Sequence, residues 1–186
     1  WDAAAAEKGG YEHFMLKEIH EQPKAVRDTM SQRITSDKKG VSFEELVWDA
    51  VYLNSFNKIY IVACGTAYHA GLVGKYYIEK LARVLVEVDV ASEFRYRDPI
   101  VDEKTLLIVV SQSGETSDTL AALKESKRRG AKTLAITNVV GSSIAREADQ
   151  VVYTWAGPEI AVASTKAYTT QLVIFFMLAL YMAEIK

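Results

Sequence analysis

The strongest constraint on the fold is a repeated alternation of short apolar runs with helix-like segments. The runs rich in apolar and β-branched residues are 59–63, 84–90, 106–110, 133–136 and 151–153. The spacing between and after them favours helices over 68–81, 120–129, 144–148 and 169–185. Strands that are apolar along their whole length are buried on both faces, as in a parallel sheet covered by helices on both sides. The sequence therefore predicts an α/β three-layer sandwich with a five-stranded parallel, flavodoxin-like sheet.

The region before the first apolar run has a different pattern. We interpret residues 1–10 as a linker or cloning remnant, 11–55 as an N-terminal helical lead-in and 56–186 as the main domain. The spacing around Pro23 predicts a helix pair or one kinked helix, and Ser42 with Glu45 resembles a capping box that opens an amphipathic helix over 42–52. The chain lacks an initiator Met and ends in an apolar helix without a Gly cap, so we expect a piece of a longer polypeptide.

Composition narrows the function classes. Lys and Arg number 22 against 24 Asp and Glu, a formal net charge of −2, which argues against a nucleic-acid-binding surface. One Cys and three scattered His predict neither an internal disulfide nor a metal site, and they favour the cytoplasm. The longest apolar run, 172–182, is shorter than the roughly 18 residues of a membrane span, so it predicts a buried helix. Its nearly complete lack of a polar face predicts packing on a partner domain or subunit.

The chemistry is expected in loops at the carboxyl ends of the strands, where open parallel sheets bind ligands. Three such loops are rich in small or hydroxyl residues, at 64–68, 111–116 and 162–165. The second places Ser111, Ser113, Thr116 and Ser117 at a strand-to-helix turn, where free N–H groups and the helix dipole favour an anion. Several donors at once suit a phosphate monoester. A helix cap is the alternative interpretation for any one of these hydroxyls.

Other candidate residues have simpler interpretations. Gly71 and Gly74 lack the spacing of a dinucleotide fingerprint. Cys64 has no recognisable catalytic partner and fits a small buried residue better than a nucleophile. Apart from Glu115 and His69, no credible general base lies beside the hydroxyl loops. We predict no catalytic residue in this chain.

Four segments carry a resemblance to a known family. They are Ala63-Cys64-Gly65-Thr66, 91–97, Ser111-Gln112-Ser113-Gly114-Glu115-Thr116 and Val162-Ala163-Ser164-Thr165-Lys166-Ala167. From about Tyr11 to the C-terminus the chain resembles the first sugar-isomerase (SIS) subdomain of the glutamine:fructose-6-phosphate aminotransferase family. That family has a glutaminase domain followed by two SIS subdomains. It makes glucosamine 6-phosphate and glutamate from fructose 6-phosphate and glutamine in amino-sugar biosynthesis.

The resemblance implies roles for particular residues. Residues that hold the sugar phosphate are Ser111, Gln112, Ser113 and Thr116. Residues that line the sugar are Cys64, Gly65, Thr66, Val162, Ala163 and Ser164. Family members often have Ser where this chain has Ala67. The resemblance implies no cofactor, and it places the catalytic Lys, Glu and His in the second SIS subdomain and its tail.

We therefore expect the phosphosugar-binding half of an aminotransferase that is inactive without its second SIS subdomain and glutaminase domain. We also expect a homodimer that binds neither nucleic acid nor membrane. Two alternatives stay open. A stand-alone SIS-type isomerase would need its own acid–base pair. A regulatory sugar-phosphate sensor would need a binding extension that residues 1–55 do not resemble.

Overall fold

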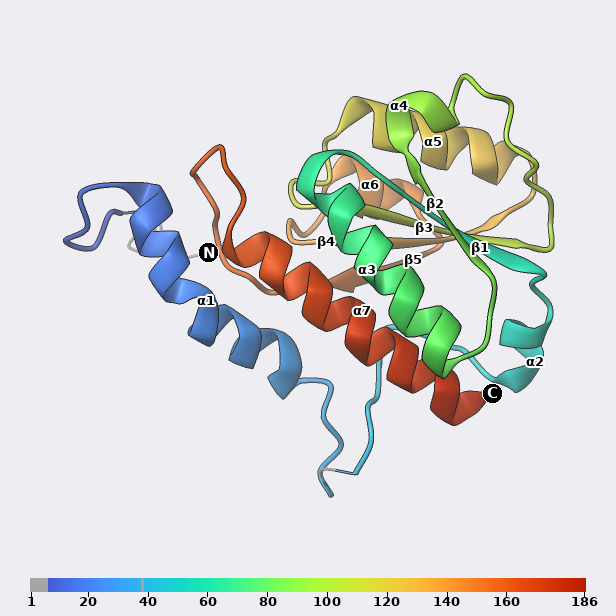
Figure 1. Cartoon of the computed structure of the whole chain (residues 1–186), viewed down its shortest axis with the longest axis horizontal. Helices are drawn as coiled ribbons and strands as arrows, with labels where there is room; N and C mark the ends of the chain where they lie inside the picture. The colour runs from blue at the N-terminus through green and yellow to red at the C-terminus, as the bar shows by residue number, and fades with distance from the viewer. Residues whose placement is uncertain (1–6, 38) are drawn as a thin grey trace.

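The computed structural model describes residues 7–37 and 39–186, and its centre is a five-stranded parallel sheet (Figure 1). Its strands are β1 (Lys58–Ala63), β2 (Val86–Val90), β3 (Thr105–Ser111), β4 (Lys132–Thr137) and β5 (Gln150–Tyr153). The order is β2-β1-β3-β4-β5, and every neighbouring pair is parallel. This is the flavodoxin-like order that the sequence predicts. The chain adds β2 on one side of β1 and then adds β3, β4 and β5 in turn on the other side. The direction in which strands are added therefore reverses between β1 and β3.

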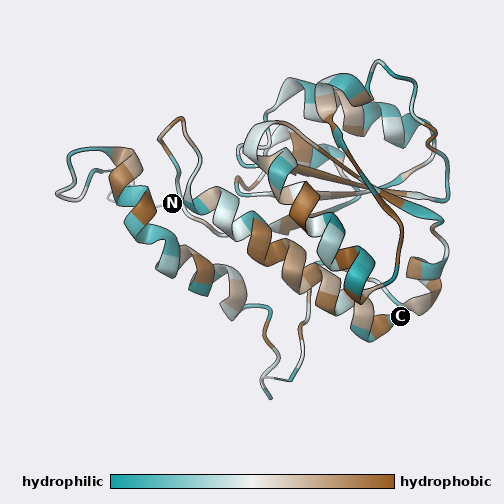
Figure 2. Ribbon diagram, viewed as in Figure 1, coloured by the Kyte–Doolittle hydropathy of each residue, from teal (hydrophilic) through white to brown (hydrophobic). Residues whose placement is uncertain are grey.

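Helices cover both faces of the sheet, as predicted. One face is covered by α3 (Gly65–Leu81) and α7 (Lys166–Ile185), and the other by α4 (Ala91–Phe94), α5 (Ser117–Arg128) and α6 (Ser143–Glu147) (Figure 1). Alternate residues of each strand enter the two cores: Ile59 and Ile61 face α3 and α7, whereas Tyr60 and Val62 face α4 and α5. The strands and much of α7 are accordingly the most hydrophobic ribbons in Figure 2. The short helix α4 is an element that the sequence pattern did not predict.

Two glycines of α3 have packing roles rather than a role in binding a dinucleotide. A Cβ atom on Gly71 would lie 2.8 Å from a methyl group of Ile61, and one on Gly74 would lie 2.5 Å from the ring of Phe175. Contacts that short force neighbouring atoms to move. Gly71 therefore lets α3 lie close on the sheet, and Gly74 lets it lie close to α7.

The lead-in departs from prediction in its second part. Helix α1 (Phe14–Ser31) is a single helix that contains Pro23, in line with one of the two predicted alternatives. Proline has no N–H to donate, and the carbonyl of Ile19 accepts instead from the Gln22 side chain at 3.1 Å. The short helix α2 (Ala50–Asn54) replaces the helix predicted over 42–52, and its N-cap is Asp49, whose carboxylate accepts from Tyr52 N.

The predicted capping box was wrong because its two residues have tertiary partners. Ser42 N donates to Arg33 O at 2.8 Å, and the Glu45 carboxylate accepts from the buried Arg33 guanidinium at 2.5 Å. The apolar residues Phe43 and Leu46 are buried in the core beneath the sheet without forming a helix. Their burial, rather than a helical period, accounts for the apolar spacing of this segment.

Helix α7 is long and apolar enough, by length and composition, to cross a membrane, and it is the one such helix found among the described residues. About 44% of its most apolar window is buried inside the protein. A core helix passes the same test, and Ile174, Phe175 and Leu178 are completely buried against the sheet and α3. The prediction that the apolar run forms a buried helix is confirmed for these residues, whereas Phe176 remains 44% exposed.

Candidate functional site

A polar cavity of about 460 Å³ lies at the carboxyl ends of β1 and β3, where the strand order reverses. In Figure 1 the N-terminal ends of α3 and α7 lie on the same side of the molecule, toward this edge of the sheet. The cavity gathers all ten residues predicted to bind the sugar phosphate: Cys64, Gly65, Thr66, Ser111, Gln112, Ser113, Thr116, Val162, Ala163 and Ser164. Three loops separated by up to about a hundred residues therefore meet in one place.

The loop after β3 is shaped by its own hydroxyl groups. Ser111 Oγ accepts from Gly114 N at 3.1 Å and lies 2.9 Å from Thr116 Oγ1. Ser113 Oγ accepts from Glu115 N at 3.2 Å. Gly114 has φ +67°, and a Cβ atom there would lie 2.0 Å from Ser142 Oγ. The loop therefore curls tightly and presents hydroxyls to the cavity, while Ser117 does not line it.

The helix ends around the cavity differ in how they are capped. Cys64 and Thr116 occupy the N-cap positions of α3 and α5, but neither side chain makes a capping hydrogen bond. The cap interpretation of Thr116 is therefore wrong, because its hydroxyl pairs with Ser111 instead. Asp118 lies in the first turn of α5, where it pairs with Arg95 at 3.3 Å. Since neither N-cap side chain takes up the free N–H groups, both helix ends can donate to an anion in the cavity.

The N-terminus of α7 is capped by a carboxylate. Glu159 Oε1 accepts from Thr165 N at 2.8 Å and Ala167 N at 3.1 Å, and Oε2 accepts from Ser164 Oγ at 2.9 Å. The Glu159 carboxylate therefore already supplies the negative charge that the N-terminus of α7 attracts. The α3 and α5 side is the place where a phosphate fits best.

A buried carboxylate on α1 holds the loop between β5 and α7. Glu18 is 2% exposed, and its Oε1 accepts from Ile160 N at 2.6 Å and Ala161 N at 3.2 Å. The following residues Val162 and Ala163 are exposed at the rim of the cavity. Helix α1 thus positions a loop that lies more than 140 residues away along the chain.

Several lining residues were missed by sequence reasoning. They are Val110, Glu159, Ala161 and Gln171, and Ala67 joins them beside the predicted residues. Gln171 had one signal in the sequence, since it is a polar residue directly before the apolar run 172–182. Glu159 had none, because its role depends on how the loop folds back onto the start of α7.

The two acid–base candidates lie outside the cavity lining. The carboxylate of Glu115 accepts from Ser143 N at 2.8 Å, and this bonding with Ser143, together with the charge of Arg146, lowers the pKa of Glu115 below its ordinary value. The His69 ring lies against the Tyr68 ring with centroids 5.5 Å apart. Cys64 Sγ accepts from Thr119 Oγ1 at 3.9 Å. Within residues 7–37 and 39–186, no group of three or more His, Cys, Asp or Glu side chains could hold a metal ion.

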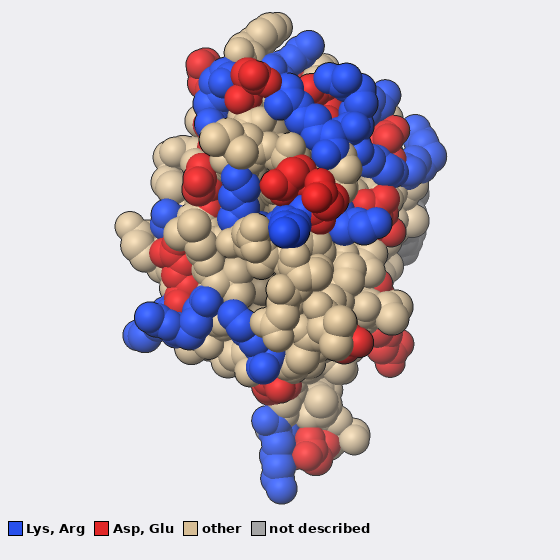
Figure 3. All heavy atoms as spheres, turned by 90° about the vertical axis from the view of Figure 1, so that its right-hand side faces the viewer, with Lys and Arg blue, Asp and Glu red and all other residues tan. Residues whose placement is uncertain are grey.

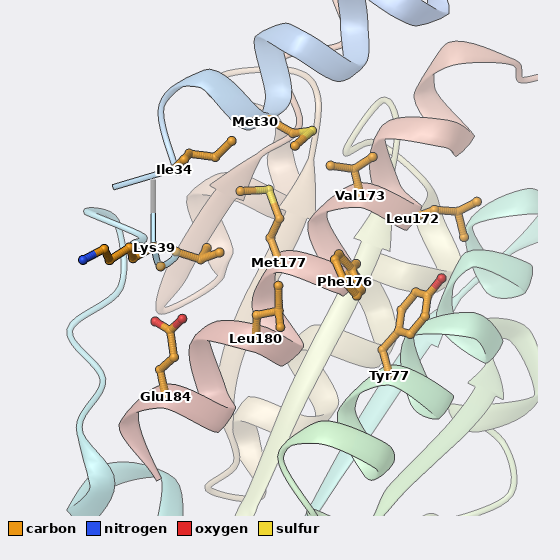
Figure 4. Close-up of a pocket in the computed structure, with 12 residues that line it drawn as sticks. Met30, Ile34, Lys39, Tyr77, Leu172, Val173, Phe176, Met177, Leu180 and Glu184 are labelled. Atoms are coloured by element: carbon orange, nitrogen blue, oxygen red, sulfur yellow. The ribbon is translucent and has the colours of Figure 1, made fainter. Parts of the chain in front are cut away.

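A larger cavity, of about 540 Å³, is apolar and lies away from the hydroxyl loops (Figure 4). Side chains from α1, the segment after it, α3 and α7 surround it, among them Met30, Ile34, Tyr77 and Met177. Its polar side chains, Lys39, Tyr77 and Glu184, come from separate elements and do not form a loop of small donors like the one after β3. Size alone would point to this cavity, but the donor chemistry assigns the ligand site to the polar one.

Comparisons with known proteins identify the family to which the chain is similar. The SIS domain family model matches residues 52–181. The chain is 67% identical over its whole length to glutamine–fructose-6-phosphate aminotransferase (isomerizing) of Clostridium tetani, and it spans 30% of that protein's length.

Solved structures share the architecture. The C-terminal domain of glucosamine-fructose-6-phosphate aminotransferase from Francisella tularensis matches 96% of this chain with a TM-score of 0.87 and 46% identity, and 49% of that domain is covered. Glucosamine-6-phosphate deaminase from Thermotoga maritima, at 23% identity and a TM-score of 0.74, shares the fold. The family model covers most of the chain, including the three loops of the polar cavity, and the chain belongs to the SIS domain family.

Proposed function

We propose that this chain is the phosphosugar-binding half of the isomerase region of a glucosamine-6-phosphate synthase, and that it binds fructose 6-phosphate and glucosamine 6-phosphate. The observation that carries the proposal is the polar cavity, where a hydroxyl-rich loop lies between two helix N-termini that no side chain caps. The 67% identity to the Clostridium tetani aminotransferase supports the choice of ligand.

The ligand is oriented by the two unlike walls of the cavity. The phosphate dianion lies against Ser111, Gln112, Ser113 and Thr116, where hydroxyl donors and the dipoles of α3 and α5 stabilise negative charge. The sugar extends along residues 64–66 and 162–164. Neutral donors bind a dianion without moving protons, so these residues bind and orient the substrate.

The complete polypeptide is proposed to be the aminotransferase. Moving a proton between adjacent carbons needs a base within hydrogen-bond reach, and neither Glu115 nor His69 lines the cavity. The Glu159 carboxylate does line it, but its oxygens already accept from the start of α7. Because the chain spans 30% of its Clostridium tetani relative, the remaining length has room for the base, the ammonia source and a second SIS subdomain. The chain alone binds ligand without turning it over.

The partners and location follow the same reasoning. A second SIS subdomain of the same polypeptide is proposed to cover the exposed apolar side of α7. In its absence a second copy of the chain covers this side, and we expect a homodimer. Charged side chains of both signs lie beside one another on the face in Figure 3, which supports a small-molecule ligand rather than nucleic acid. We place the protein in the cytoplasm, because its one Cys fits a reducing compartment. We propose that it needs neither a membrane nor a cofactor.

Calorimetric titration with fructose 6-phosphate, glucosamine 6-phosphate and unphosphorylated fructose tests the proposal. We expect both phosphosugars to bind and fructose not to bind. Ser113→Ala and Thr116→Val should each weaken binding about 10- to 150-fold, since each removes a hydrogen bond to a charged group. Ser117→Ala is the matched control, because this hydroxyl lies in the same turn outside the cavity lining. If Ser113→Ala and Thr116→Val bound both phosphosugars as tightly as Ser117→Ala and the wild type, the proposed phosphate site would be contradicted.

Turnover distinguishes the stand-alone isomerase. The purified chain is incubated with fructose 6-phosphate and an ammonium salt, and glucose 6-phosphate and glucosamine 6-phosphate are assayed. We expect neither product. Formation of either, abolished by Glu115→Gln or His69→Gln, would assign the chain to the self-sufficient isomerases instead.

A further inference from the structure

Gln171 is a buried polar residue that the proposed binding mode does not yet use. It is the sixth residue of α7, is 2% exposed and lines the polar cavity. Its Oε1 atom is buried without a hydrogen-bond partner. Within the described ranges, its amide nitrogen has no hydrogen-bond partner either.

Next to Gln171, the buried positions of α7 are either hydrogen-bonded or apolar. Thr170 donates from Oγ1 to Ala167 O at 2.9 Å, and the neighbouring buried positions Ile174, Phe175 and Leu178 are apolar. An unpaired buried carboxamide costs free energy, whereas an apolar side chain of the same shape would not. Arg33 Nε and Ser126 Oγ are also buried and unpartnered, but neither residue lines this cavity.

The position of Gln171 indicates which part of a ligand it meets. It belongs to the α7 side of the cavity, where the Glu159 carboxylate already occupies the helix N-terminus. A phosphate is repelled there and attracted to the uncapped ends of α3 and α5. A carboxamide carries both a donor and an acceptor, which matches a neutral hydroxyl group.

We propose that Gln171 is a specificity-determining residue whose carboxamide hydrogen-bonds a hydroxyl group of the sugar part of the ligand. This inference rests on the proposed function, because it assigns the residue a role at the same site. Gln171 then separates a sugar phosphate from bare phosphate and leaves the binding of the phosphate group to the loop after β3.

Gln171→Met tests the inference, because it keeps the length of the side chain and removes its polar atoms. Titrations with fructose 6-phosphate and with inorganic phosphate are run on the wild-type chain, on Gln171→Met and on Gln32→Met. We expect Gln171→Met to bind fructose 6-phosphate about 5- to 50-fold more weakly and inorganic phosphate unchanged. Its urea midpoint without ligand should equal or exceed that of the wild type. Gln32→Met makes the same change at an exposed residue outside the cavity and should alter neither affinity.

The outcomes separate the inference from the function beneath it. Wild-type affinity of Gln171→Met for fructose 6-phosphate would overturn the inference alone. Equal losses for both ligands together with a lower urea midpoint would also overturn it, since that pattern reports a structural role. A wild-type chain that fails to bind fructose 6-phosphate would contradict the proposed function and this inference with it.

Discussion

Gly114 is the residue on which the shape of the loop after β3 depends most directly. Its φ of +67° is disfavoured for other residues, and a Cβ atom would collide with Ser142 Oγ at 2.0 Å and with Ser142 Cβ at 2.4 Å. We expect Gly114→Ala to destabilise the chain by about 3 kcal/mol or more, since backbone strain adds to overpacking. Phosphosugar affinity should fall as well. Urea unfolding and calorimetric titration measure the two effects.

Gly141→Ala is the matched control for this prediction. Gly141 has φ +71°, but a Cβ atom there meets nothing within 4 Å. It should therefore cost only about 1–2 kcal/mol of backbone strain and leave phosphosugar affinity unchanged. If the two variants lost the same stability, the close approach of Gly114 to Ser142 would not matter.

At the residue scale, the sequence pattern predicted the loops at 64–68 and 111–116 because both follow buried strands directly, whereas 162–165 lies beyond β5, just before α7. The full set of ten residues came from the family resemblance, and all ten line one cavity. Gln171, Glu159 and Glu18 could not be assigned this way. Their partners or cavity neighbours lie on other elements, and Glu18 is separated from Ile160 by 142 residues.

Among the elements, α1 controls the rim of the cavity through Glu18. Glu18→Ala would leave the backbone N–H groups of Ile160 and Ala161 without their acceptor, because both donate to this carboxylate. We expect a loss of about 1.5–3 kcal/mol, faster amide exchange at both residues and weaker phosphosugar binding. Glu18→Gln keeps one acceptor and should have smaller effects. Unchanged exchange in Glu18→Ala would show that the loop is held by other contacts.

The C-terminal end of α5 should give the chain a measurable acid dependence. Glu125 bonds Arg128 through both carboxylate oxygens, at 2.8 and 3.0 Å, and Arg129 at 2.7 Å. Hydrogen bonding to Arg128 first, and then to Arg129, lowers the pKa of Glu125 from 4.5 to about 2. A lowered pKa in the folded state means that stability is present above about pH 4.5 and is lost as pH falls toward 2.

Glu125→Gln tests this dependence. The melting temperature of the wild type should exceed that of the variant most above pH 5, and the difference should shrink between pH 4.5 and 2. Added salt should also reduce it, because the pairs are at the surface. If the difference in melting temperature stayed constant between pH 4.5 and 2, Glu125 would not be the source of the acid dependence.

Element boundaries were predicted best where burial and periodicity agree. The strand order followed from continuous apolar runs and short connections, whereas the helix over 42–52 was wrong because Ser42 and Glu45 bond Arg33. A local capping pattern could not reveal a competing partner on another element. Helices α5 and α7 begin three residues earlier than predicted, since their first turns are polar and lie beside the cavity.

For the whole molecule, the lead-in and the domain share one core. Phe43, Leu46, Trp48 and Leu53 are buried with strand residues in the cluster under α7, although they precede the boundary predicted at residue 56. Truncating a large buried side chain like these costs about 2–5 kcal/mol, and a whole domain is stable by only about 5–15 kcal/mol. A chain of residues 56–186 should therefore lose cooperative unfolding and bind the hydrophobic dye ANS.

A chain of residues 40–186 is the control for this truncation. It lacks α1 and Arg33 but keeps the four buried apolar side chains, so it should still unfold cooperatively at a lower melting temperature than the full chain. It should also bind phosphosugar more weakly, because Glu18 no longer holds Ile160 and Ala161. Circular dichroism melting of the three chains measures the difference. Equal, cooperative melting of 56–186 and 40–186 would mean that residues 40–55 cover the core without stabilising it.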